Sequence, residues 1–154
     1  MGIICELYRI SDSKIEELKK LNSDIAEEFL DKNYAYIYGK YHKQNDTVFS
    51  MDKGWDVTRF LLQECDNSSD KILNKLDKRF IKSNDVKLIN KVLELIEIGD
   101  LKKVYNKDKL IKNHIYGAKY DVYWEYINNY HLKLYKSAFK RASELNDGIA
   151  TNHN

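Results

Sequence analysis

The sequence contains no proline, two cysteines and six glycines among its 154 residues. The cysteines, Cys5 and Cys65, are isolated and have no CxxC spacing, which excludes a zinc ribbon, a thioredoxin motif and a disulfide-rich fold. Each glycine stands alone, so a glycine-rich phosphate-binding loop of the GxGxxG or Walker kind is excluded as well. No apolar run approaches the roughly 18 residues that a membrane-spanning helix requires, and we expect no membrane partner.

Arginine is also scarce, with four arginines against 22 lysines. The formal net charge is only +2. Arginine is the preferred residue for phosphate forks and base edges, so the composition argues against a dedicated DNA or RNA reader. The charge is divided unevenly: residues 1–77 carry a net charge of −4 and residues 78–154 one of +6. Such asymmetry steers a charged partner in some proteins, and in others it only draws the two halves together.

What the chain does have is material for one hydrophobic core, since 43% of its residues are hydrophobic and 12 are tyrosines. This composition excludes a disordered chain, and the length fits a single domain over residues 1–154 that needs neither disulfides nor a metal. No basic region followed by an apolar stretch opens the sequence, so it shows no secretion signal. We therefore expect a cytoplasmic protein with reduced thiols.

Hydrophobic periodicity predicts an α+β fold that is mostly helical, with five to six helices and a small sheet. The sheet is expected to combine an N-terminal strand over 2–10, the 34–50 region and a short strand over 149–151. Ser13 and Glu16 match a capping box at the first helix, and Gly99 is the expected stop of the fourth. The expected helices cover residues 13–31, 52–65, 71–80, 83–99, 100–113 and 121–146.

Motifs that carry catalysis are missing, because the sequence has no HExxH, no GxSxG and no EF-hand loop. We therefore predict no catalytic residue, no metal and no cofactor. Asp52 and Asp56 could face one cation, but aspartates at a helix start ordinarily cap that helix. No two of the four histidines have the i, i+3 or i+4 spacing of helical metal ligands: His42, His114, His131 and His153.

The tyrosines fall into two groups. One group alternates along a polar, extended segment that follows the first helix, whose outer face is acidic. Tyrosines are enriched in protein interfaces, so this segment is a candidate contact surface. The other group, Tyr123, Tyr126 and Tyr130, lies on the apolar stripe of the last helix and is predicted to be core. Trp124, His131 and Tyr135 lie beside that stripe and fit either role. The predicted partner-binding surface comprises Glu16, Glu27, Glu28, Tyr34, Tyr36, Tyr38 and Tyr41.

Several stretches together resemble the YfbM-like family of small bacterial domains of unknown function. They are residues 1–4, the segment DKGWDVTRFLL over 52–62, Ile115-Tyr116, and the closing helix with Ile149-Ala150. The pattern Lys-x-Trp-x-x-x-His-x-Leu-Leu is the most specific of them, and here Arg59 stands in place of its histidine. Gly117 likewise stands where the family usually has proline. The resemblance implies an α+β domain with a small sheet and several helices, and it implies no reaction.

Two main hypotheses about function remain. The first is a non-enzymatic protein-binding module, such as an immunity-type protein that neutralises a toxin domain, or an accessory protein. The second is an enzyme or small-ligand-binding protein. A third, nucleic-acid contact through residues 71–119, is disfavoured by the scarcity of arginine. The pocket of the second hypothesis would lie near Trp55, Asp56, Arg59, His114 and Tyr116.

Overall fold

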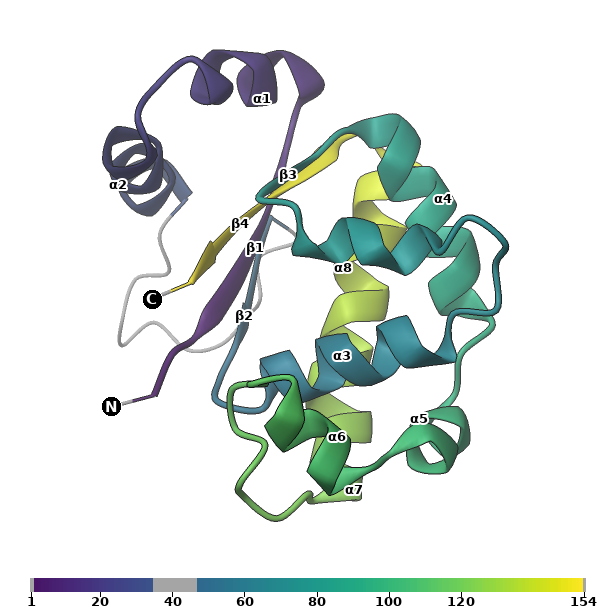
Figure 1. The fold of residues 1–154 in the computed structure, drawn as a ribbon. Coiled ribbons are helices and arrows are strands. Elements are labelled where there is room, and N and C mark those ends of the chain that lie inside the picture. The colour runs from purple at the N-terminus through teal and green to yellow at the C-terminus, as the bar shows by residue number, and fades with distance from the viewer. Residues whose placement is uncertain (1, 35–46, 154) are drawn as a thin grey trace.

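The computed structural model describes residues 2–34 and 47–153 as a four-stranded antiparallel sheet between two layers of helices (Figure 1). The strand order is β2-β1-β4-β3. The two ends of the chain supply the central pair, because β1 (Cys5–Ile10) is hydrogen-bonded to β4 (Gly148–His153) over its whole length. The flanking strands are β2 (Val48–Met51) beside β1 and the two-residue β3 (Phe80–Ile81) beside β4. The predicted α+β class and sheet are confirmed.

The helices lie on both faces of this sheet (Figure 1). One layer holds α1 (Asp12–Lys19) and α2 (Ser23–Tyr34). The other layer contains α3 (Trp55–Cys65), the 3₁₀ helix η1 (Ile72–Asp77), α4 (Ser83–Glu94), α5 (Ile98–Val104), α6 (Lys107–Lys112), and a long last helix made of α7 (Trp124–Tyr126), the π-helical segment η2 (Ile127–Leu132) and α8 (Lys133–Glu144). Within the described residues, no helix combines the length and apolar character needed to cross a membrane.

The sheet divides the interior into two hydrophobic clusters, because side chains alternate between the faces of a strand. Cys5 and Leu7 of β1 point into the larger cluster, with α3, α4 and α8. Tyr8 and Ile10 of the same strand point into the smaller cluster, with α1 and α2. A strand covered on both faces needs apolar residues at almost every position, which explains the nearly continuous apolar run at the N-terminus.

The first expected helix, over 13–31, is in fact two helices. Ser11, not Ser13, is the N-cap of α1, and its hydroxyl accepts the backbone N–H of Lys14 at 3.2 Å. At the start of α2, the side chain of Asn22 accepts the N–H of Ile25 at 2.9 Å. A capping asparagine starts a new helix because its side chain replaces a missing helical acceptor. The chain therefore turns between α1 and α2, and the predicted capping box at Ser13 is wrong.

Three other expectations are corrected in the second layer. The segment 71–80 is not one helix, because Phe80 leaves η1 to form β3 beside β4. Gly99 does not stop the fourth helix, which ends five residues earlier, and it lies inside α5. The expected helix over 100–113 is divided between α5 and α6, where the Asn106 side chain caps the second helix through the N–H of Lys109. These divisions raise the helix count above the five to six expected.

Phe139 on α8 is fully buried in the larger cluster, and Leu95 after α4 is 82% exposed. We expect Phe139→Ala to lower the free energy of unfolding by about 3–5 kcal/mol, since it removes a buried ring and leaves a cavity. The matched Leu95→Ala variant should change that free energy by less than about 0.5 kcal/mol. Urea denaturation of both variants checks this, and equal losses would contradict the placement of the core.

Candidate functional site

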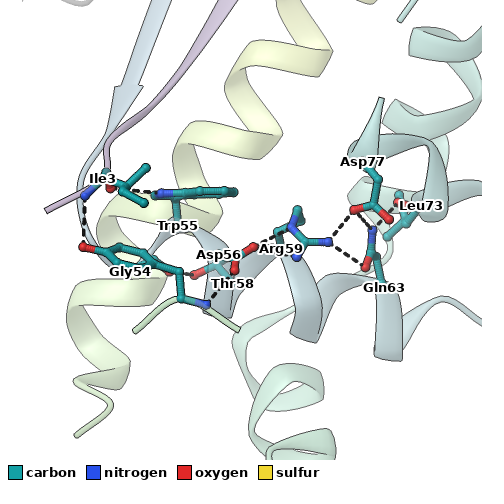
Figure 2. Close-up of polar contacts among 10 residues, drawn as sticks. Ile3, Gly54, Trp55, Asp56, Thr58, Arg59, Gln63, Leu73 and Asp77 are labelled. Atoms are coloured by element: carbon teal, nitrogen blue, oxygen red, sulfur yellow. Dashed lines mark hydrogen bonds and ion pairs between the residues drawn. The ribbon is translucent and has the colours of Figure 1, made fainter. Parts of the chain in front are cut away.

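The predicted pocket residues at the start of α3 form a hydrogen-bonded network (Figure 2). Asp56 is buried, and its carboxylate receives the Nε–H of Arg59 at 2.7 Å and the backbone N–H of Tyr116 at 2.8 Å. Arg59 extends the network to the side chains of Gln63, at 3.1 Å, and Asp77. Asp56 therefore joins α3 to the turn that follows α6, and Arg59 joins α3 to η1.

Trp55 connects the same network to the N-terminal segment (Figure 2). Its indole Nε1–H donates to the carbonyl of Ile3 at 3.1 Å, and the N–H of Ile3 donates to the Tyr116 hydroxyl at 2.9 Å. The indole also stacks on His153 of β4, with ring centroids 4.4 Å apart. These contacts tie the start of the chain, its end and α3 together.

His114 does not join the other four residues. It is exposed in the turn after α6 with a φ of +56°, and its backbone N–H donates to the carbonyl of Ile111. The cavity beside Trp55 and Arg59 has a volume of about 10 Å³, against several hundred Å³ for a typical ligand pocket. This space is about that of a single water molecule. Trp55, Asp56, Arg59 and Tyr116 therefore pack as a structural network in this conformation.

A second polar cluster lies on the other side of the β2–α3 turn. The Oδ1 atom of Asp52 is 2.9 Å from Nε2 of His131, and its Oδ2 atom accepts the hydroxyl of Tyr126 at 2.6 Å. Tyr130, from the same helix, donates its hydroxyl to the carbonyl of Ser50 at 2.9 Å. The rings of Tyr126 and Tyr130 are each 5.2 Å from the imidazole. One carboxylate thus anchors the long last helix to the turn.

The imidazole of His131 is 1% exposed, and its Nδ1 atom has no hydrogen-bond partner in the described part of the chain. Burial lowers the pKa of His131 below its ordinary value, although the hydrogen bond and charge of Asp52 oppose that shift. Burial also acts to raise the pKa of Asp52, but the hydrogen bonds from Tyr126 and His131 outweigh it and hold that pKa low. At neutral pH the cluster therefore pairs a neutral imidazole with a carboxylate.

Two local features of the backbone make this cluster possible. His131 lies in the π-helical segment η2, and such segments recur at functional sites. Gly54 lies directly against the ring, because a Cβ atom at that position would be 2.4 Å from Cε1 of His131. The absence of a side chain at position 54 is thus a requirement of the buried imidazole.

An aromatic surface borders this cluster, and we define it as Tyr120, Tyr123, Trp124 and Tyr126. All three tyrosines of this surface are exposed, with exposed fractions of 71% for Tyr120, 72% for Tyr123 and 45% for Tyr126. Tyr123, Trp124 and Tyr126 line an open cleft of about 780 Å³, which is formed by residues 122–126 and Asn129. The prediction that Tyr123 and Tyr126 are core is therefore wrong. Tyr123 precedes the first helical residue, and the wider turns of η2 change the helical phase before α8.

The predicted partner-binding surface is only partly within the described residues. Glu16 is exposed and pairs with Lys82 and Lys19, Glu28 is exposed and pairs with Lys32, and Glu27 is half-buried. Tyr34 is the last residue of α2 and so is not part of an extended segment. The remaining predicted contacts lie outside the described residues: Tyr36, Tyr38 and Tyr41.

A third cleft, of about 520 Å³, lies where α3, α4 and α5 meet and includes Cys65. Burial raises the pKa of Cys65 to about 11, so its thiol is protonated at neutral pH and is a poor nucleophile. Among residues 2–34 and 47–153, no three His, Cys, Asp or Glu side chains are grouped as metal ligands.

The sequence predicts Asp52 only as a helix cap or a cation ligand, and it allows His131 to be a core residue or a surface residue. The contact between them spans 79 positions, so no local spacing could indicate it. One signal was available: an isolated glycine beside a tryptophan, Gly54-Trp55, at the start of a helix. Glycine is common at the start of a helix, and it also allows another group to approach the backbone closely.

The layered sheet, the helix begun by Trp55 and the closing central strand define a small α+β domain whose two termini pair in one sheet. A family described as a domain of unknown function (DUF1877) matches residues 1–151, and the chain belongs to that family. A solved structure of a protein of unknown function, YfbM from Escherichia coli, is similar with a TM-score of 0.63 and 17% sequence identity. The match covers 98% of this chain and 99% of that one. At this identity the likeness shows the fold alone.

The resemblance inferred from the sequence is thereby confirmed. A comparison with curated proteins gives no match.

We expect Gly54→Ala to lower the free energy of unfolding by about 1–3 kcal/mol, because the new methyl group would overlap His131. Gly99→Ala is the matched control, since a Cβ there meets nothing within 4 Å and alanine favours a helix. The control should be neutral or stabilising by up to about 1 kcal/mol. Chemical denaturation measures both, and an unaffected Gly54→Ala variant would contradict the tight contact.

A second pair of variants tests the network at Arg59. Asp56→Ala should cost about 3 kcal/mol of stability, because it leaves a largely buried guanidinium without its main partner. Asp77→Ala removes the exposed partner of the same arginine and should cost less than about 1 kcal/mol. Thermal unfolding followed by circular dichroism distinguishes the two, and the reverse order would show that Asp77 is the main partner.

Proposed function

We propose that this protein is a non-enzymatic protein-binding module and that the aromatic surface is its contact region. The observation that carries this proposal is the exposure of three rings, those of Tyr120, Tyr123 and Tyr126, the last two of which line an open cleft. Tyrosine and tryptophan are enriched in the centres of protein interfaces, where they supply most of the binding energy. Aromatic groups exposed together commonly indicate an interaction site.

Two of the four rings, those of Trp124 and Tyr126, are held by contacts with neighbouring side chains, which favours a role in binding. The rings of Trp124 and Tyr105 are nearly perpendicular, with centroids 5.3 Å apart, and the Lys102 ammonium lies 6.0 Å from the Trp124 centroid. Tyr126 is held by Asp52 through its hydroxyl. Side chains that are already ordered lose little conformational entropy when a partner binds, so the same contacts give higher affinity.

An immunity-type protein that occludes a toxin domain is the particular form of this function that we propose, with an accessory protein as the other form. The support is the uneven charge of the chain, net −4 over residues 1–77 and net +6 over 78–154. Uneven charge accelerates association with a partner of complementary charge. The aromatic surface lies in residues 78–154, the half of the sequence with net positive charge, and Glu125 is the charged residue that lines its cleft.

The surface predicted from the first helix has less support than the aromatic surface. Its acidic groups Glu16 and Glu28 already pair with lysines of this chain, and a partner would have to compete with those pairs. The alternative function, a ligand pocket near Trp55, has less support still, because the cavity there is only about 10 Å³.

The test begins with a photo-crosslinking amino acid at position 123, which identifies the partner by its covalent adduct in cells. The purified partner is then titrated with the wild type and with the double variant Tyr120→Ala/Tyr123→Ala. We expect the double variant to bind at least about tenfold more weakly, as for the loss of interface hot spots. Leu95→Ala, which changes an exposed apolar residue elsewhere, should bind as the wild type does.

Equal affinities of the wild type and the Tyr120→Ala/Tyr123→Ala variant would refute the aromatic surface as the contact region. A Tyr36→Ala/Tyr38→Ala variant separates the two candidate surfaces in the same titration. If only that variant loses affinity, the partner binds at the surface predicted from residues 16–41.

A further inference from the structure

We propose that Asp52 and His131 are positioning residues of the aromatic surface: they hold Tyr126 in place while His131 is neutral and release it when the imidazole takes up a second proton. The inference concerns the regulation of the proposed binding site, and its biological meaning rests on that proposed function. Its physical content can be tested without a partner.

The geometry makes Asp52 the point on which Tyr126 depends. Its two carboxylate oxygens serve two side chains of the last helix, Oδ2 the hydroxyl of Tyr126 at 2.6 Å and Oδ1 the imidazole of His131 at 2.9 Å. Tyr126 also lines the open cleft and is 45% exposed, and the ring contacts that hold it are with Tyr130 and His131 of its own helix, each with centroids 5.2 Å apart. The shape of one wall of the cleft therefore depends on a carboxylate from the β2–α3 turn.

The surroundings of His131 oppose a second proton. In the neutral ring, Nε2–H donates to Asp52 and Nδ1 carries only a lone pair. Nδ1 is buried, and a Cβ atom at Gly54 would be 3.0 Å from it, so residue 54 lies against this edge of the ring. A proton on Nδ1 would create a buried N–H group without an acceptor, which is unfavourable, and more so when the ring is charged. The imidazolium can reach water only if the ring moves away from Gly54.

The titratable groups that face the imidazole are Asp52 from the turn and Tyr126 and Tyr130 from its own helix. Asp52 is charged at neutral pH because its pKa is held low. Tyr126 is neutral because burial and the hydrogen bond to Asp52 raise its pKa. The attraction between Asp52 and an imidazolium opposes the release of Tyr126. Half of the Asp52 side chain is exposed, however, so solvent screens that attraction.

The direction of the pH effect follows from the lowered pKa of His131. Above the ordinary value of 6.5 the ring is neutral in the folded and unfolded chain, and it contributes no pH dependence. As the pH falls below 6.5 the unfolded chain binds the proton first, so stability declines until the pH reaches the folded pKa. Burial also lowers the pKa of His153, which acts in the same direction, so the test must observe His131 itself.

The experiment is an NMR titration of the protein with isotope-labelled histidine and tyrosine rings, from about pH 8 to about pH 4.5. We expect His131 to titrate with a midpoint below 6.5 and the ring signals of Tyr126 to shift with the same midpoint. Tyr120 and Tyr123 serve as internal controls, because neither is held by Asp52 and neither should follow that midpoint.

Two variants separate positioning from a general loss of structure. In Asp52→Asn the signals of Tyr126 should already lie near their acid position at neutral pH, with the remaining spectrum unchanged. In His131→Gln the signals of Tyr126 should lose their pH dependence. The proposal is overturned if His131 stays neutral down to about pH 4.5, if Tyr126 ignores its titration, or if Asp52→Asn leaves Tyr126 unaltered.

The outcome is independent of the partner experiment, because the titration uses the protein alone. If Tyr126 responds but the Tyr120→Ala/Tyr123→Ala variant binds normally, the positioning stands and the proposed function fails. If both hold, affinity for the partner should fall roughly fivefold or more between about pH 7.5 and about pH 5.5 in the wild type, and should change less in Asp52→Asn.

Discussion

The pairing of β1 with β4 is the constraint on which the rest of the fold depends. The register joins Cys5 to His153 at one end and Ile10 to Gly148 at the other, so the two ends of the chain form the centre of the sheet. The outer strands β2 and β3 each pair with only one of these two, and neither would belong to a common sheet without them. Because helices cover both faces, β1 contributes side chains to both hydrophobic clusters. Such non-local pairing requires the two ends of the chain to meet before the sheet can form, which slows folding.

The β2–α3 turn is the second junction, because side chains on its two sides reach different parts of the molecule. Asp56 is hydrogen-bonded to the turn at Tyr116, and Trp55 is hydrogen-bonded to the N-terminal segment. Asp52 is hydrogen-bonded to the last helix. Arg59, in place of the histidine of the related pattern, contacts Asp56, Gln63 and Asp77 at once. A planar guanidinium can contact three groups in this way, which an imidazole cannot.

The candidate site was only partly accessible from the sequence. Trp55, Asp56, Arg59 and Tyr116 were expected together and are in one network, since three of them share a helical turn and the fourth follows a predictable break. His114 is exposed in a turn where it has a left-handed backbone conformation, which the sequence did not indicate. The pair of Asp52 and His131 is invisible to local spacing. Tyr126 was assigned to the core because a single helical period was carried through a segment that contains π-helical turns.

The sequence by itself determined the α+β class, the strands at both ends and a helix over 52–65, which in the structure begins at Trp55. Alternation, helical period and start signals act within a few residues, so they can be recognised without tertiary structure. Tertiary structure decided which apolar residues are buried. Phe80 became a strand residue because β4 offers an edge, where the N–H of Thr151 donates to the carbonyl of Arg79 at 2.8 Å. Tyr123 and Leu95 stayed exposed because no described element packs over them. Burial depends on what lies opposite a residue, and only the folded chain brings distant segments together.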